Sequence, residues 1–209
     1  HLTGLLDAGG KGHLEAAGTA EQPIMFRSVA GDDKDQWTGL SFVGGTGQLS
    51  YVTLQNGGAD TSTLEPVALP TYYPQAIQVC YFPPLFIHDV TEGEVRIEHS
   101  IIQNNGNYWV WRTDCIMRIY NSHVVLHDNY FSDNGAPVNR DEWYMPEDNF
   151  GIFAYGASTG LTMTNNIFEN NLGYHVYADG QYTLDGNVYR NQPQGVKLLP
   201  TSSAQHSKM

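Results

Sequence analysis

Three segments of this 209-residue sequence concentrate acidic and aromatic side chains. They span residues 57–76, 106–114 and 135–150. The charged residues that we take as candidate catalytic groups are Arg112, Asp114, Asp141 and Glu142. Hydrolysis of a glycoside needs two carboxyl groups about 5 to 9.5 Å apart, one protonated as the acid and one ionised as nucleophile or base. Asp114 with Asp141 or Glu142 is the pair that fits. The alternative, which we favour, is that these are solvated loop charges of an acidic protein.

Aromatic residues occur in the same three segments. Those that we take as candidate ligand contacts are Tyr72, Tyr73, Tyr108, Trp109, Trp111, Trp143 and Tyr144. Flat aromatic rings match the apolar faces of sugar rings, but they also pack loops onto a scaffold. Both interpretations stay open. If the rings line a groove, the expected partner is a polysaccharide or a cell-surface glycan.

A β-elimination lyase needs different groups. It requires a base for the proton α to a uronate carboxylate, and a cation that neutralises this carboxylate. The four lysines all lie outside the three segments, which leaves Arg112 and Arg140 as cations there. The acidic run at residues 32–35 resembles a calcium-binding loop but lacks the ordered ligand spacing of an EF-hand. We therefore expect no metal site and no required cofactor, with Ca²⁺ as an optional ligand.

The composition narrows the class of partner. Twenty-two acidic residues stand against 10 basic ones, giving a formal net charge of -12, and no block of Lys or Arg occurs. This balance argues against binding to nucleic acid or to an anionic membrane surface. No apolar run approaches the roughly 18 residues needed to span a bilayer, so no membrane insertion is expected. The 22 glycines and the frequent Asn residues indicate many tight turns between short strands.

A repeated pattern must position the three segments. It consists of an apolar residue, two variable positions, a small polar residue, two apolar residues, one variable position, and Asn or Asp. Copies begin at Ile97, Leu126, Met163 and Leu184, and a weaker copy begins at Leu49. The steps of 29, 37 and 21 residues vary while the pattern stays constant. We therefore predict a solenoid with insertions at one corner of its coils.

Stacked coils bring equivalent residues into contact. Each coil buries its apolar side only against its neighbours, with strands paired in parallel along the axis. The repeat predicts an internal stack of Ile102, Phe131, Phe168 and Tyr189. It also predicts a polar ladder of Ser100, Asn129, Asn166 and Asn187 at a turn. There Asn would tolerate the left-handed backbone and its amide would bond the next coil.

A polar row is expected on the outside of the same coils. Its members are Glu98, His127, Thr164 and Asp185, and one position further along His99 should stand over Asp128. A neighbouring His and carboxylate could act as a base and its orienting partner. Structural pairing between coils is the alternative, and we favour it.

These repeats resemble the right-handed parallel β-helix of the pectin-lyase-like superfamily, in its secreted, uncharacterised type. Residues 18–28, 37–42 and 49–52 are similar to coils of such proteins. The resemblance implies a single all-β, right-handed parallel β-helix (a solenoid) over residues 1–200. The polar and small residues at 201–209 indicate a disordered tail. The resemblance also implies an extracellular or cell-surface location. More coils usually precede this stretch in such proteins, which leaves open that the chain belongs to a larger polypeptide.

Two functional hypotheses follow. The first is a non-catalytic surface or adhesin module, or one that binds carbohydrate through the aromatic loops. The second is a polysaccharide-degrading enzyme, a glycoside hydrolase or polysaccharide lyase, that uses Arg112, Asp114, Asp141 and Glu142 in an acidic groove. Polygalacturonase-type proteins carry Asn-Thr-Asp, a paired Asp, Gly-His-Gly and Arg-Ile-Lys, and this sequence has none of them. Their absence favours the first hypothesis.

The two cysteines leave one structural question. Cys80 and Cys115 either pair in an oxidising compartment or remain buried free thiols.

Overall fold

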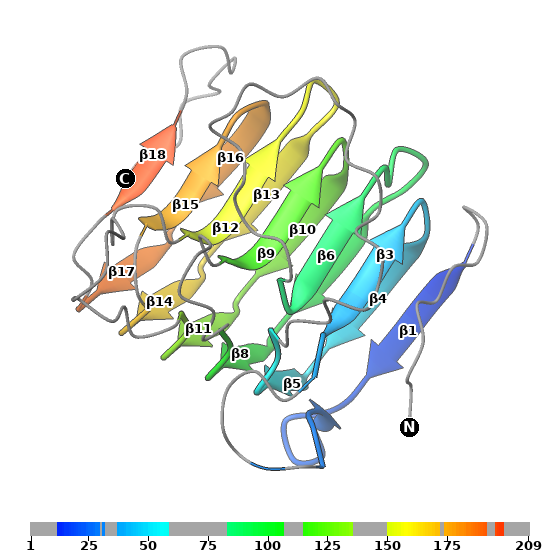
Figure 1. The fold of residues 1–209 in the computed structure, drawn as a ribbon, viewed down its shortest axis with the longest axis vertical. Coiled ribbons are helices and arrows are strands. Elements are labelled where there is room, and N and C mark those ends of the chain that lie inside the picture. The colour runs from blue at the N-terminus through cyan, green and yellow to red at the C-terminus, as the bar shows by residue number, and fades with distance from the viewer. Residues whose placement is uncertain are drawn as a thin grey trace.

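The computed structural model describes residues 12–29, 31, 37–58, 83–106, 115–135, 150–171, 174–191 and 195–198. In this part of the chain the strands form three parallel sheets of six strands each. Figure 1 shows the coils following one another from β1 to β18. Each complete coil contributes one strand to each sheet, so the prediction of an all-β parallel β-helix is confirmed. Within the described ranges we find no helix of the length and apolarity that crossing a bilayer requires.

The chain visits the three sheets in a fixed order, which we name A, B and C. Sheet A contains β1 (His13–Ala17), β4 (Thr46–Ser50), β7 (Val95–Glu98), β10 (His123–His127), β13 (Gly160–Thr164) and β16 (Gln181–Asp185). Sheet B contains β2 (Ile24–Phe26), β5 (Val52–Gln55), β8 (Ile101–Gln103), β11 (Tyr130–Ser132), β14 (Ile167–Glu169) and β17 (Val188–Arg190). Sheet C contains β3 (Leu40–Val43), β6 (Leu85–His88), β9 (Cys115–Tyr120), β12 (Phe150–Tyr155), β15 (Tyr174–Ala178) and β18 (Val196–Leu198).

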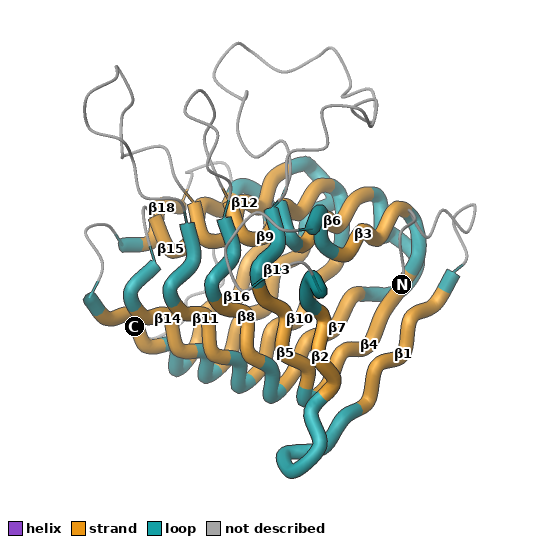
Figure 2. Tube along the Cα trace, turned by 60° about the horizontal axis from the view of Figure 1, so that its bottom comes forward, coloured by secondary structure: helices purple, strands orange, loops and turns teal. Residues whose placement is uncertain are grey.

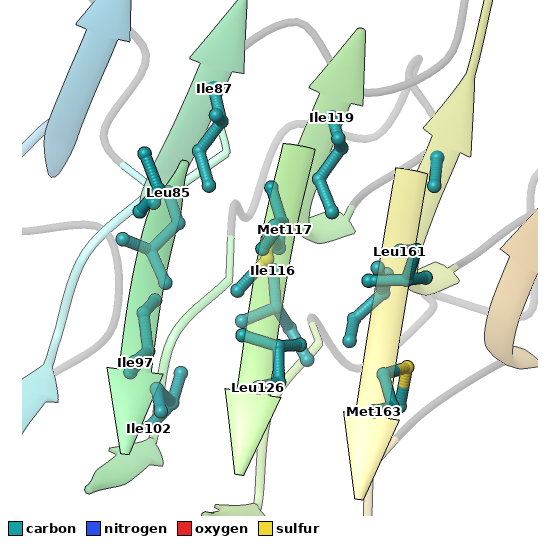
Figure 3. Close-up of a cluster of buried hydrophobic side chains, with 14 of the residues drawn as sticks. Leu85, Ile87, Ile97, Ile102, Ile116, Met117, Ile119, Leu126, Leu161 and Met163 are labelled. Carbon is teal, nitrogen blue, oxygen red and sulfur yellow. The ribbon is translucent and has the colours of Figure 1, made fainter. Parts of the chain in front are cut away.

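The interior is a set of columns of equivalent apolar residues. Alternation along each strand turns every second side chain inward, where it meets its counterpart from the next coil. Figure 3 shows this layering for residues of sheets A, B and C, including Ile97, Leu126 and Met163 of sheet A, which are fully buried. In sheet B the predicted stack is confirmed. The rings of Phe131 and Phe168 lie parallel with centroids 4.5 Å apart, and Tyr189 continues the stack at 5.2 Å from Phe168.

The predicted polar ladder lies at the corner between sheets A and B. The Oδ1 of Asn166 accepts hydrogen bonds from both the backbone N and the Nδ2 of Asn129, each at 3.0 Å. The Nδ2 of Asn166 also donates to the carbonyl of Leu126, at 3.0 Å. One detail of the prediction is wrong. The left-handed residue of each turn is the one before the ladder, such as Asp128 with φ of 52° and Asn165 with φ of 56°. The ladder residue itself is therefore free to point inward.

A second ladder, which the sequence analysis did not predict, lies at the corner between sheets B and C. It consists of Asn105, Asn134 and Asn171, all buried. The backbone N of Asn105 donates to Oδ1 of Asn134 at 3.0 Å, and that of Asn134 donates to Oδ1 of Asn171 at 3.1 Å. Sheet B is thus bounded on both sides by stacked amides, which satisfy the backbone groups that the turns leave unpaired.

The insertions share one corner, as predicted. The first leaves β5 and returns to β6, the second joins β8 to β9, and the third joins β11 to β12. All three therefore connect sheet B to sheet C, and Figure 2 shows the short turns of the other corners stacked along the solenoid. We call this the insertion corner. Residues 59–82, 107–114 and 136–149 within these insertions, and the predicted tail at 201–209, lie outside the described residues.

The first ladder should contribute strongly to stability. Replacing Asn129→Ala leaves the buried carbonyl of Ile97, to which Asn129 Nδ2 donates at 2.7 Å, without that donor. We expect the free energy of unfolding to fall by about 2 kcal/mol, the cost of an unmade buried hydrogen bond. Urea denaturation followed by circular dichroism measures this. The exposed Gln181→Ala variant is the control and should change stability by less than about 0.5 kcal/mol. Equal stability of the two variants would show that the ladder is dispensable.

Candidate functional site

Seven side chains on the outer face of sheet C form the most unusual group in the described structure. They occupy two columns, and strand alternation turns them away from the core. We call them the sheet C cluster: Phe86, His88, Arg118, Tyr120, Phe153, Tyr155 and Tyr177. Phe86 pairs in register with Arg118, and Arg118 with Phe153. The second column places Tyr120 between His88 and Tyr155.

Arg118 lies at the centre of this cluster. Its side chain faces outward, yet the residue is only 3% exposed. Its Nε donates a hydrogen bond to the hydroxyl of Tyr155 at 2.9 Å, and a terminal guanidinium nitrogen donates to the same oxygen. The guanidinium carbon lies 5.6 Å from the ring centroid of Phe86 and 5.4 Å from that of Tyr155. Such cation–π contacts strengthen when water is excluded. The cluster thus holds a planar cation against aromatic walls.

The rings contact one another in a continuous series. His88 lies 4.7 Å from Tyr120, and Tyr120 lies 4.9 Å from Tyr155, measured between ring centroids. In the first column Phe153 stacks on Tyr177 at 4.9 Å. Phe153 and Tyr155 are buried, whereas Phe86, Tyr120 and Tyr177 are half-buried. Aromatic rings therefore cover much of the outer face of sheet C around Arg118.

Burial shifts the pKa of His88, Tyr155 and Tyr177 within the cluster. His88 Nδ1 lies 2.9 Å from Oδ2 of Asp89. Burial lowers the pKa of His88, and the charge of Arg118 adds to this effect, while Asp89 opposes it. The imidazole is therefore neutral at pH 7 and able to accept a proton. Burial raises the pKa of Tyr155 although Arg118 opposes it, so its phenol stays protonated. A base, an acid and a cation thus lie within one group of touching side chains.

None of the side chains singled out at first as catalytic or as aromatic contacts lies in the described part of the chain. This holds for Arg112, Asp114, Asp141 and Glu142, for the tyrosines and tryptophans of the three insertions, and for the acidic run at 32–35. Their roles stay predictions. The structure does show which strands flank these segments. Each of the three insertions leads into a strand of sheet C, and β9 begins directly after Asp114.

The predicted outer polar row is confirmed on the A–B side. Glu98, His127, Thr164 and Asp185 pair in register. His127 Nδ1 lies 2.6 Å from Oγ1 of Thr164, and its Nε2 lies 3.2 Å from Oδ2 of Asp128. That carboxylate oxygen is also 3.6 Å from Nδ1 of His99, as expected. The described residues contain no group of three ligating side chains suited to a metal ion. The contacts link three successive coils and fit the structural interpretation.

The centre of the sheet C cluster was not predicted from the sequence, where Arg112 and Arg140 were the candidate cations and Arg118 was not. A signal was present, because Arg118 is the only charged residue in the otherwise apolar or aromatic strand Cys115–Tyr120. A lone cation in such a strand must either face solvent or find buried partners. Only the neighbouring strands show that the partners are Tyr155 and Phe86.

The cysteine question is answered in favour of pairing. Cys115, at the start of β9, is disulfide-bonded and 2% exposed, and the sequence contains one other cysteine, Cys80. Cys115 packs with Phe153 and Tyr155, so the bond lies beside the sheet C cluster.

Comparison with known proteins agrees with the architecture. A family model described as a right handed beta helix region matches residues 75–207, more than half of the chain. The chain belongs to this family. No curated protein and no solved structure gave a match. Family membership accounts for the right-handed parallel β-helix, but this family name specifies no ligand or reaction, because function depends on the site rather than on the scaffold.

The hydroxyl of Tyr155 should stabilise the cluster. A Tyr155→Phe variant keeps the ring but removes a hydrogen-bond acceptor of the buried guanidinium. We expect a loss of about 1 to 3 kcal/mol in the free energy of unfolding, typical for a buried charged group that loses a partner. The Tyr51→Phe variant at the A–B corner is the matched control and should change stability by less than about 0.5 kcal/mol. Thermal and urea unfolding of both variants test this, and equal effects would contradict the assignment.

The lowered pKa of His88 predicts a component of stability that depends on pH. Between the lowered pKa and its ordinary value of 6.5, the unfolded chain binds more protons at this position than the folded protein does. Stability from His88 is therefore fully present above pH 6.5 and is lost as the pH falls toward the lowered pKa. A His88→Gln variant should lose less stability than the parent protein over this window. Thermal unfolding at a series of pH values tests it, and parallel curves would contradict the prediction.

Proposed function

We propose that this chain is an extracellular, non-catalytic β-helix module that binds a polysaccharide or cell-surface glycan on the outer face of sheet C. The observation that carries the proposal is the sheet C cluster. It presents aromatic rings on the face to which all three insertions return. Aromatic rings next to polar hydrogen-bonding groups are the usual means of binding sugars, since the rings cover apolar ring faces and the polar groups bond hydroxyls.

The half-buried members of the cluster would supply the edge of the binding surface. Phe86, Tyr120 and Tyr177 each keep part of their ring accessible, while their buried neighbours hold them in place. Asp89 is exposed beside this row and offers a carboxylate to sugar hydroxyls. Trp109, Trp111 and Trp143 belong to insertions that return to β9 and β12, so the proposal adds them to the same surface. A rigid scaffold with preformed side chains limits the entropy lost on binding.

The disulfide at Cys115 supports the proposed location. Disulfides persist in oxidising compartments and are rare in a reducing cytosol. The acidic composition supports a neutral or cationic ligand rather than nucleic acid.

A second candidate function is a polysaccharide-degrading enzyme. The observation that favours it is the neutral imidazole of His88 in the same cluster as the protonated Tyr155 and the cation of Arg118. In a lyase the imidazole would remove the proton α to a uronate carboxylate, and Arg112 or Arg140 of the insertions would neutralise that carboxylate. A hydrolase would instead use the loop carboxylates Asp114 with Asp141 or Glu142.

The binding proposal is tested with a glycan array, followed by calorimetry on the glycans that respond. Variants Trp109→Ala, Trp111→Ala and Trp143→Ala should each weaken binding by about tenfold, which corresponds to about 1.4 kcal/mol. Tyr177→Ala should weaken binding in the same direction. The control is Tyr51→Ala at the A–B corner, which should leave affinity unchanged. Absence of any responding glycan, or an equal effect of the Tyr51 variant, would refute the proposal.

The enzymatic candidate is tested by incubating the chain with a panel of neutral and acidic polysaccharides. A hydrolase releases reducing ends, and a lyase releases unsaturated products that absorb in the ultraviolet. His88→Ala and Arg112→Met should abolish lyase activity, whereas Asp114→Asn should abolish hydrolysis. Silence of the parent protein across the whole panel would eliminate this candidate and leave the binding module.

A further inference from the structure

The second ladder brings chemically labile dipeptides to the insertion corner. The sequence contains three Asn-Gly pairs, at 56–57, 105–106 and 134–135. All three lie where the chain leaves sheet B, directly after β5, β8 and β11 or one residue later. Asn105 and Asn134 are members of the second ladder, and Gly57 occupies the equivalent position one coil earlier, where its N donates to Oδ1 of Asn105 at 2.9 Å. The pairs are therefore stacked on neighbouring coils.

Asn-Gly is the dipeptide in which the side-chain amide is most readily lost, because glycine offers no steric barrier to its own nitrogen. The glycine N loses its proton and forms a bond to Cγ of the asparagine. The bond from Cγ to the amide nitrogen breaks and ammonia leaves, giving a five-membered succinimide. Water then opens either carbonyl of the ring and yields aspartate or isoaspartate. The overall reaction consumes one water and releases one ammonia, and it needs no other reactant.

In the folded protein each attacking nitrogen is already engaged. Gly57 N donates to Asn105 Oδ1, as described above. Gly106 N donates to the carbonyl of Gly57 at 3.0 Å, and Gly135 N donates to that of Asn105 at 2.7 Å. A nitrogen whose proton is held in a buried hydrogen bond cannot readily lose it.

The leaving amides are held as well. Asn105 and Asn134 are 0% exposed, and Asn56 is 1% exposed. Asn134 Nδ2 donates to the carbonyl of Ile102 and to Oδ1 of Asn171, both at 2.8 Å. Asn56 donates through Nδ2 to the carbonyl of Gly31 at 3.3 Å and accepts from Asn104 at 2.9 Å. The folded structure thus holds both reacting groups of each pair away from water.

We propose that Asn56, Asn105 and Asn134 are sites of covalent modification that unfolding exposes, and that conversion of Asn105 or Asn134 prevents the second ladder from forming again. The folded solenoid preserves them as asparagine. A chain that opens at the insertion corner loses the amides in an irreversible step. The fraction of aspartate or isoaspartate at these positions therefore increases each time the chain unfolds at the insertion corner.

The products fit the ladder badly for two reasons. Aspartate at position 134 has no N–H to donate to Ile102 or Asn171, and it places a negative charge at a site that excludes water, which is costly. Isoaspartate adds one methylene to the main chain, which moves every later backbone group out of register with the neighbouring coil. Either product leaves buried polar groups unsatisfied.

The experiment compares folded and denatured protein in mildly alkaline buffer at body temperature, with peptide mapping by mass spectrometry. In the denatured chain all three Asn-Gly peptides should gain the mass difference between an amide and a carboxylic acid. In the folded protein the rate should be lower by a factor of about a thousand or more, as expected when reaction requires opening of a buried segment. The internal controls are Asn129, Asn166 and Asn171, which are followed by Tyr, Ile and Leu and should stay intact in both samples.

The effect on refolding is measured on the same samples. Recovery of the β circular dichroism signal after removal of denaturant should fall in proportion to modified Asn105 and Asn134. A directly made Asn134→Asp variant should be destabilised, whereas the exposed Asn191→Asp variant should not. Equal rates in folded and denatured protein would overturn the proposal, as would full refolding of modified chains. Glycan binding is not used as a readout, so failure here leaves the proposed function untouched.

Discussion

Parallel hydrogen bonds between successive coils hold every strand directly over its equivalent, and the rest of the structure depends on this register. Because equivalent residues stack, one residue type repeated at one position becomes a continuous column. Phe131 over Phe168 and Asn129 over Asn166 are two cases, one apolar and one polar. A shift by a single residue would turn every inward side chain outward. The amide ladders on both sides of sheet B oppose such a shift, since each amide bonds both its counterpart in the next coil and a backbone carbonyl of the preceding coil.

The outer faces of sheets A and C carry different kinds of side chain. The outer face of sheet A carries ion pairs and polar contacts, such as Arg96 with Glu94 and Glu98. Sheet C instead buries aromatic rings and Arg118 on its outer face, next to a disulfide. A buried cation is costly unless it is well partnered, and Tyr155 and Phe86 provide part of that partnership.

Electrostatics and packing act together in the sheet C cluster. The desolvation that makes the interior of the cluster favourable for rings also keeps His88 neutral and Tyr155 protonated. Burial of one set of side chains thus fixes both the packing of the rings and the protonation of these two groups. The A–B polar row lacks this property, because its histidines and Asp128 are more than a third exposed on their side chains.

The sequence by itself determined the all-β fold, the columns and the single insertion corner, because a solenoid repeats local rules. The pattern around Ile97, Leu126 and Met163 specifies both strand alternation and turn chemistry within eight residues. The paired Asn-Asn and Asp-Asn at 104–105 and 133–134 would also have revealed the second ladder. Only the tertiary structure decided that His88, Arg118 and Tyr155, from three different coils, form one cluster, and that Cys115 is paired. Those contacts depend on the lengths of the insertions between coils and on which outward side chains become buried. Neither the insertion lengths nor the burial of outward side chains repeats regularly along the sequence, so neither could be predicted from it.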